Sequence, residues 1–176
     1  MGLLYVLTLM LGFNIQSESY CSDQFLFHHR KQYLLIGDSE AGALSYSVKR
    51  QKADGCWDFK FLVGSRTEYW KKESKKINDM YDIIFISLGA NDYASPKSIS
   101  GVTEISRWAS EHSHECIWIG PPKLWNKESD VIEIINKNTK CKFIDSSKEK
   151  IELSKDLVHP TYNGADFWLK KVLDQK

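Results

Sequence analysis

Short apolar runs alternate with longer amphipathic stretches along the chain from residue 32 onward. Most of the apolar runs lack polar alternation, which is typical of strands covered on both faces. The amphipathic stretches carry apolar residues at mixed three- and four-residue spacing, as at Val131, Ile134 and Ile135, and predict helices. The expected strands are 33–36, 59–63, 83–88, 116–119 and 143–144, and the expected helices are 41–52, 67–78, 98–112, 129–138 and 162–173.

This alternation predicts a single-domain α/β protein: a three-layer α/β/α sandwich with a central, mostly parallel five-stranded sheet of the doubly wound, flavodoxin-like kind. A chain of 176 residues has the size of one ordinary domain, and no internal repeat or linker divides it. Ligands of such sheets bind outside the carboxyl ends of the strands, near the point where strand order reverses. Candidate functional residues are therefore expected just after the strands.

The first nineteen residues have the pattern of a leader. An apolar run over residues 3–13 is too short to span a membrane comfortably, and a polar stretch follows it. Ser17 and Ser19 stand at the spacing that a signal peptidase reads, so we expect cleavage before Tyr20, with 1–19 as signal peptide and 20–176 as the folded domain. No basic residue precedes the apolar run, which leaves an uncleaved membrane anchor or a buried first strand as alternatives.

Four cysteines follow this leader: Cys21, Cys56, Cys116 and Cys141. An even number in an exported chain permits two disulfides, and adjacency of neighbouring strands favours Cys21 with Cys56 and Cys116 with Cys141. Neither paired CxxC motifs nor clustered histidines occur, so no metal site is expected. The sequence thus predicts a protein that is secreted, to the periplasm or outside the cell. We expect no stable membrane insertion after cleavage of the leader. Four buried free thiols are the alternative in a reducing compartment.

Net charge identifies no partner, because 24 Lys and Arg residues nearly balance 23 Asp and Glu residues. The lysines at positions 71, 72, 75 and 76 are interrupted by acidic residues, as on the solvated face of a helix. The chain lacks the basic stripe that nucleic-acid binding requires, so no nucleic-acid partner is expected. The sequence does not determine an oligomeric state.

A serine follows the first expected strand through a tight turn. The apolar run ends in Gly37 and Asp38, and Ser39 would open the next helix. The backbone N–H of a residue at a helix N-terminus can stabilise negative charge, as an oxyanion requires. An ordinary helix-capping serine would give the same local pattern.

Two further segments place polar side chains at the same edge of the sheet. A buried strand ends in Gly89-Ala90-Asn91-Asp92, where Asn91 is either a turn former or a side-chain amide donor. Near the C-terminus, Asp156 precedes His159 by three residues. A carboxylate and an imidazole in one loop supply the orienting group and the base that a serine nucleophile needs.

These blocks, in this order, resemble the SGNH hydrolase superfamily, also called the GDSL family: Gly37-Asp38-Ser39, Gly64, Gly89-Ala90-Asn91-Asp92 and Asp156-Leu157-Val158-His159. The resemblance covers nearly the whole mature chain and implies a serine esterase with Ser39 as nucleophile, His159 as general base and Asp156 as its orienting acid. It also implies an oxyanion hole made by the backbone N–H groups of Ser39 and Gly64 and the side-chain amide of Asn91. Gly64 would otherwise be a turn glycine. No cofactor is expected, because a triad activates its serine without metal.

The residue after the nucleophile departs from the family pattern. Glu40 stands where many relatives have leucine, and a carboxylate there is expected to disfavour anionic substrates. Asp38 is interpreted as a structural acid that caps backbone donors behind the serine.

We expect the substrate to carry a small acyl group, such as acetyl, on an extracellular carbohydrate, because the chain has no large insertion that could form a lid over a long acyl chain. Trp70, Tyr93 and Trp125 lie where they could stack on a sugar, although such aromatics also fill cores. One alternative is a lysophospholipase or short-chain lipase with an apolar groove formed by Leu44, Tyr46 and Trp125. Another is a non-catalytic glycan-binding module on the same fold. For the acetylesterase and for the lipase alike, the expected partner is a small-molecule or glycan ester.

Overall fold

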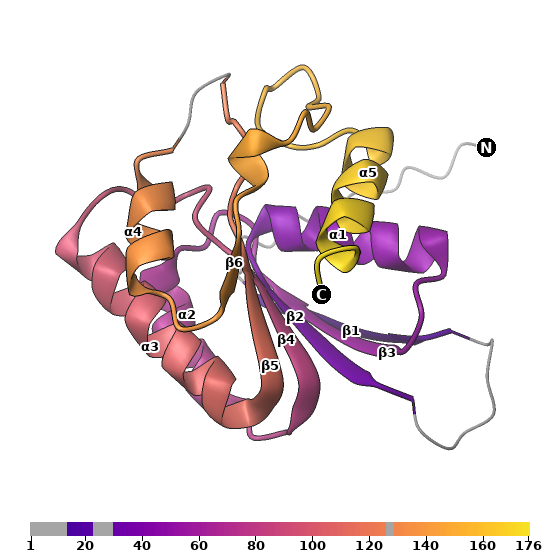
Figure 1. Ribbon diagram of the computed structural model, residues 1–176, viewed down its shortest axis with the longest axis horizontal. Coiled ribbons are helices and arrows are strands. Elements are labelled where there is room, and N and C mark those ends of the chain that lie inside the picture. Colours follow the sequence, from indigo (N-terminus) through magenta and orange to yellow (C-terminus); the bar gives the residue numbers. More distant parts are fainter. Residues whose placement is uncertain (1–13, 23–29, 126–128) are drawn as a thin grey trace, which may run out of the picture.

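The central feature of the computed structural model, which describes residues 14–22, 30–125 and 129–176, is a six-stranded sheet (Figure 1). Its strand order is β1-β3-β2-β4-β5-β6. The strands β2 to β6 run parallel to their neighbours, and β1 pairs with β3 antiparallel. The strands are β1 (Gln16–Cys21), β2 (Gln32–Gly37), β3 (Cys56–Phe61), β4 (Tyr81–Ser87), β5 (Ser113–Ile119) and β6 (Lys142–Ile144).

Helices cover both faces of this sheet (Figure 1). They are α1 (Ser39–Gln51), α2 (Thr67–Glu73), α3 (Pro96–His112), α4 (Val131–Asn138) and α5 (Tyr162–Leu173). On one face α1 and α5 bury an apolar cluster that includes Phe85 and Trp168, and on the other α3 and α4 pack over a second cluster that includes Ile84 and Trp118. The predicted single-domain three-layer α/β sandwich is confirmed.

The edge strand β1 was not expected, so the sheet has six strands in place of five. Its sequence is mostly polar and its side chains are mostly exposed, so it carries no apolar run. Pairing with β3 along six residues and the Cys21–Cys56 disulfide hold it to the sheet. Four of its residues lie within the expected signal peptide. Cleavage before Tyr20 remains a prediction, and the apolar run of the leader lies outside the described residues.

The strand β3 begins three residues earlier than expected, at Cys56. Because its neighbour β1 is the sheet edge, β3 alternates between buried Trp57, Phe59 and Phe61 and the more exposed Asp58 and Lys60. The continuous apolar run that predicts a strand therefore covers only the last part of β3.

Two disulfides join the four cysteines as expected. Cys21–Cys56 links directly paired residues of β1 and β3, and Cys116–Cys141 links β5 to the segment before β6. Disulfides persist in oxidising compartments, which agrees with a secreted or extracellular protein. Within the described parts of the chain, no helix has the length and apolar character needed to cross a membrane.

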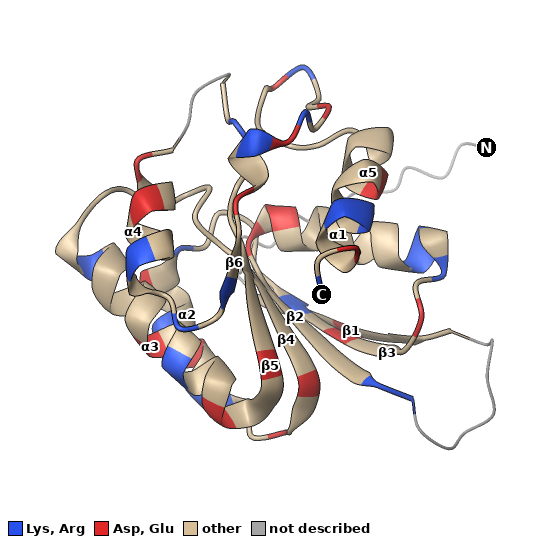
Figure 2. Cartoon of the chain, viewed as in Figure 1, with Lys and Arg blue, Asp and Glu red and all other residues tan. Residues whose placement is uncertain are grey.

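The lysines of α2 and of the 3₁₀ turn that follows it are partly neutralised by the neighbouring helix α3. Lys71 of α2 and Lys75 of the following 3₁₀ turn lie 2.7 and 2.9 Å from the carboxylate of Glu104 on α3. Hydrogen bonds from these two ammonium groups lower the pKa of Glu104 to about 2. Figure 2 shows acidic and basic residues mixed along these helices.

The first turn of α1 buries a carboxyl group that forms no hydrogen bond with any residue that the structure describes. The backbone N–H of Glu40 donates to the Asp38 side chain, but both side-chain oxygens of Glu40 are buried and accept no hydrogen bond from any described residue. Burial raises its pKa well above the ordinary value, and the nearby Asp38 raises it further. The expectation that Glu40 presents a charge to substrate is therefore wrong: Glu40 shares the inward face of α1 with Leu44 and Ser47.

We expect the double substitution Cys116→Ala and Cys141→Ala to lower the free energy of unfolding by about 3 kcal/mol, because the disulfide closes a loop of 25 residues in the unfolded chain. Urea denaturation without reductant measures this change, with the wild type in excess reductant as a comparison. Equal midpoints for the variant and the oxidised wild type would show that this bridge does not constrain the unfolded chain.

We expect Glu40→Gln to become more stable relative to the wild type as pH rises from 5 to 8. The folded-state pKa of Glu40 lies above its unfolded value, so its contribution is fully present below the unfolded pKa and is lost as pH rises towards the folded pKa. Glutamine has the same shape and does not ionise. The difference in unfolding free energy should grow by about 1–3 kcal/mol over this range. A difference independent of pH would mean that Glu40 is ionised in the folded protein.

Candidate active site

The turn that carries Ser39 lies where the strand order reverses, because β2 has β3 on one side and β4 on the other. The two strands approach closely there: the backbone N–H of Asp38 donates to the carbonyl of Ser87 on β4, and a Cβ on Gly37 would lie 1.9 Å from the same oxygen. Only glycine fits at position 37. The turn therefore delivers Ser39 to the first position of α1 at the carboxyl edge of the sheet.

The loop before α5 is folded tightly around Asp156. One oxygen of its carboxylate accepts hydrogen bonds from the backbone N–H groups of Val158 and His159, at 2.9 and 3.0 Å, and from the hydroxyl of Ser154 at 2.7 Å. Leu157 takes a left-handed backbone conformation, with φ +56°, that lets the loop turn back. Hydrogen bonds, foremost that from the imidazole of His159, hold the pKa of Asp156 below its usual range.

Ser39, His159 and Asp156 form one chain of hydrogen bonds. The distance from His159 Nδ1 to Asp156 Oδ2 is 2.7 Å, and that from His159 Nε2 to Ser39 Oγ is 3.1 Å. An ionised carboxylate only accepts, so Nδ1 carries the imidazole proton and Nε2 is free to accept the hydroxyl proton of Ser39. The fold thus brings together residues that are 120 positions apart, in the geometry that general-base activation of a serine requires.

The three expected oxyanion donors come from three loops beside this serine. The backbone N–H groups of Ser39 and Gly64 have no acceptor among the described residues. Gly64 forms an exposed turn after β3 with φ +73°, a conformation that other residues rarely adopt. The side-chain nitrogen of Asn91 donates at 3.2 Å to Asp38 Oδ2 and at 3.2 Å to the backbone carbonyl of Ser65.

Asp38 is a buried acid behind the serine. One of its oxygens caps α1 by accepting the N–H of Glu40, as expected of a structural acid, and the other accepts from Asn91. Burial raises its pKa to about 7, and the negative charge of Asp92 contributes in the same direction. The hydrogen bonds from Glu40 and Asn91 and the nearby His159 oppose this rise.

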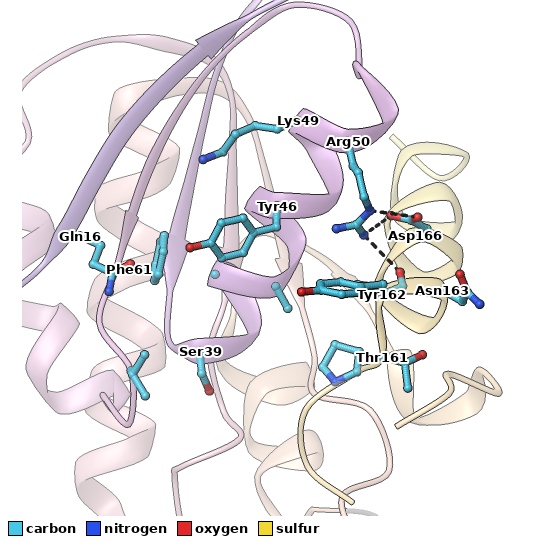
Figure 3. Close-up of a pocket in the computed structure, with 15 residues that line it drawn as sticks. Gln16, Ser39, Tyr46, Lys49, Arg50, Phe61, Thr161, Tyr162, Asn163 and Asp166 are labelled. Carbon is cyan, nitrogen blue, oxygen red and sulfur yellow. Dashed lines mark hydrogen bonds and ion pairs between the residues drawn. The ribbon is translucent and has the colours of Figure 1, made fainter. Parts of the chain in front are cut away.

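A groove of about 950 Å³ runs from Ser39 between α1, β3 and α5 (Figure 3). Its walls carry the rings of Tyr46, Phe61 and Tyr162. Gly42, which has no side chain, and Ala43 with its single methyl group also line the groove from α1. The cations along this groove are paired: Arg50 bonds the carboxylate of Asp166 and the carbonyl of Tyr162, and Lys49 bonds Glu18. The groove therefore offers mainly apolar and aromatic surface.

A smaller pocket of about 490 Å³ is lined by Gly64 and Asn91, two of the expected oxyanion donors. Two exposed aromatic residues stand in its wall, Tyr93 at 67% and Trp125 at 59% exposure. The backbone N–H of Trp125 donates to the carbonyl of Leu157 at 2.8 Å, so this wall is tied to the loop of Asp156 and His159. The guanidinium of Arg66 lies 4.7 Å from the centre of the Tyr93 ring.

Two of the aromatic and apolar residues singled out in the sequence do not belong to either hollow. Trp70 is fully buried and donates its ring N–H to Ser65, and Leu44 is a core residue between α1 and α5. Tyr46 lines the groove as expected, whereas Trp125 lies in the smaller pocket. Trp70 is buried because its side chain lies on the inner face of α2. The helix has only seven residues, so its sequence pattern does not show which face is inward.

Sequence reasoning missed several residues that surround Ser39 and its hydrogen-bond partners. Phe61 and Tyr162 line the groove, and Ser154 holds Asp156. Tyr162 stands three residues after His159, and that proximity is the one signal that could have identified it. The positions of Phe61 and Ser154 depend on the register of β3 and on the loop conformation.

No protein-family model matches the chain, and no curated protein matches it. Solved structures do share its fold. One crystal structure superposes with a TM-score of 0.57 at 14% sequence identity, over 84% of this chain and 97% of that chain. Another is a two-domain esterase active on acetylated mannans, co-crystallised with mannopentaose, with a TM-score of 0.54 at 13% identity over 82% of this chain. This chain spans about half, 49%, of that esterase, and identities this low show the fold alone.

Proposed function

We propose that the protein is a serine esterase of the SGNH type that hydrolyses carboxylic esters through Ser39, His159 and Asp156. The observation that carries this proposal is the continuous hydrogen-bond chain from Asp156 through His159 to Ser39, with links of 2.7 and 3.1 Å. Its position at the reversal of strand order, beside two substrate-sized hollows, supports the same conclusion.

In the proposed reaction Ser39 Oγ attacks the ester carbonyl while His159 Nε2 takes its proton. The negative oxygen of the tetrahedral intermediate accepts hydrogen bonds from the N–H groups of Ser39 and Gly64 and from the amide of Asn91. His159 then gives its proton to the leaving alcohol, and water hydrolyses the acyl-enzyme by the same route. Asp156, whose low pKa keeps it ionised, stabilises the imidazolium that forms in each step.

The proposed substrate is a short acyl ester, such as acetyl, on extracellular carbohydrate. The fold is shared with an esterase active on acetylated mannans, and the exposed rings of Tyr93 and Trp125 beside the oxyanion donors offer surfaces on which a sugar can stack. The two disulfides agree with an extracellular site of action. A mechanism of this kind calls for no cofactor and no nucleic-acid partner.

One observation favours a second candidate, a lysophospholipase or short-chain lipase. Such an enzyme needs an apolar groove beside Ser39, and the groove walled by Tyr46, Phe61 and Tyr162 is one. It is large enough to hold a medium-length acyl chain, and its charged side chains are closed into ion pairs.

We expect the purified protein to release p-nitrophenol from p-nitrophenyl acetate faster than from the butyrate, and from the butyrate faster than from the octanoate. Ser39→Ala should lower kcat by at least about a thousandfold, because the remaining groups lack a nucleophile. Ser100→Ala, a serine of α3 on the opposite face of the sheet, is the matched control and should retain full activity. Ester hydrolysis that survives unchanged in Ser39→Ala would exclude the serine mechanism.

Ala43→Phe distinguishes the two candidates, because a large side chain on this face of α1 fills part of the groove. For an acetylesterase we expect less than a twofold change in kcat/KM on the acetate ester. A chain-binding groove would instead give a wild-type preference for octanoate that the variant lowers roughly tenfold, since burial of about two methylenes is lost. That second result would replace the acetylesterase proposal with the lipase.

A further inference from the structure

Both protons of the Asn91 side-chain amide already take part in hydrogen bonds in this structure. Its nitrogen carries two protons, and the bonds to Asp38 Oδ2 and to the carbonyl of Ser65, both 3.2 Å long, use both of them. An oxyanion must therefore displace one acceptor. A charged oxygen is the stronger acceptor and can displace the neutral carbonyl of Ser65, while Asp38 keeps hold of the amide.

Asp38 is placed to decide the orientation of this amide. An amide presents a donor at one end and an acceptor at the other, and rotation by half a turn exchanges them. An ionised Asp38 only accepts, so it selects the nitrogen of Asn91 and leaves the second proton of that nitrogen for the oxyanion. A protonated Asp38 can donate to the Asn91 oxygen, which directs that oxygen towards the developing negative charge.

The surroundings of Asp38 make its charge responsive to pH. The groups that face it are Glu40 on α1, Asp92 in the loop after β4 and His159 in the loop before α5. Burial raises the pKa of Asp38 to about 7, so its charge changes near neutral pH. Burial and the nearby Asp38 raise the pKa of Glu40 well above its ordinary value, which favours its neutral form.

We propose that Asp38 is a positioning residue that, when ionised, holds the Asn91 amide with its N–H towards the oxyanion and, when protonated, releases or reverses it. This proposal rests on the proposed function, because it assigns a task to the oxyanion amide of that reaction. It adds a second ionisation to the reaction besides that of His159, which must be neutral to accept the proton of Ser39.

Both ionisations switch activity in the same direction. A protonated imidazole cannot accept the proton of Ser39, and a protonated Asp38 no longer holds the Asn91 amide, so each protonation removes activity. The slope of log kcat/KM against pH should therefore approach two on the acid side in the wild type. Asp38→Asn offers a single oxygen, which serves either the Glu40 N–H or the Asn91 amide, and it does not ionise. We expect this variant to show a slope of one and a kcat lowered by about ten- to a hundredfold, with KM nearly unchanged.

A double-mutant cycle tests whether Asp38 acts through Asn91. Asn91→Ala removes the amide, so adding Asp38→Asn to it should lower kcat by less than about twofold further. Glu40→Gln is the matched control, since it removes the neighbouring buried carboxyl and leaves the Asp38–Asn91 bond intact. It should keep the slope of two. Additive losses in the cycle, or a slope of one in Glu40→Gln, would overturn the proposal.

A measurement that needs no activity separates this proposal from the proposed function. The side-chain amide resonance of Asn91, identified by its loss in Asn91→Ala, should shift between pH 5 and 9 in the wild type and in Glu40→Gln but not in Asp38→Asn. A resonance that does not shift, or one that shifts equally in Asp38→Asn, would refute the link between the two residues. Absence of serine-dependent ester hydrolysis would reject the esterase and leave the outcome for Asp38 and Asn91 to this titration.

Discussion

The close approach of β2 and β4 at Gly37 is the constraint on which the whole site depends. The residue after β2 lies within hydrogen-bond distance of Ser87 on β4, so the loops after these two strands begin side by side. Asp38 then reaches Asn91, which comes from the loop after β4, and Ser39 projects at the edge towards the loop before α5. A side chain larger than hydrogen at position 37 would push the two strands apart and would separate Ser39 from the groups of the neighbouring loop.

Three carboxyl groups near the serine differ in charge because their surroundings differ. Asp156 is about half exposed, with four hydrogen bonds that favour its ionised form. Asp38 is buried with two such bonds, and Glu40 is buried with none. The order of their pKa values follows from this count of donors against the cost of burial. Burial therefore favours the neutral form of Glu40 and raises the pKa of Asp38 to about 7, whereas hydrogen bonds favour the ionised form of Asp156.

Much of the fold follows from local sequence, because the apolar strands and amphipathic helices are buried on the faces that their patterns indicate. The disulfide pairing also followed, since each pair joins neighbouring segments. What the sequence did not reveal depends on long-range packing. The polar strand β1 is stabilised by pairing and a disulfide, without an apolar face of its own, and Glu40 stands where helix electrostatics favours an exposed acid although the packing of α1 buries it.

The candidate site divides in the same way. The order of Ser39, Asn91, Asp156 and His159 along the chain and their places after strands could be identified, since each lies in a short motif. The groove could not, because its walls come from α1, β3 and α5 and exist only after these elements pack. The inward direction of Trp70 and the bond between Asp38 and Asn91 likewise depend on side-chain orientation in three dimensions.

Ser39 and His159 are separated by 120 positions along the chain, and they meet because α1 packs against α5. That packing is fixed partly by Asp166 of α5, which bonds both Ser47 and Arg50 of α1. A fragment without α1 lacks Ser39 itself, whereas a fragment without α5 keeps all three residues and loses the packing of α5 on α1. The hydrogen-bond chain is therefore sensitive to local unfolding, since loss of α5 alone would break it while most of the sheet persists.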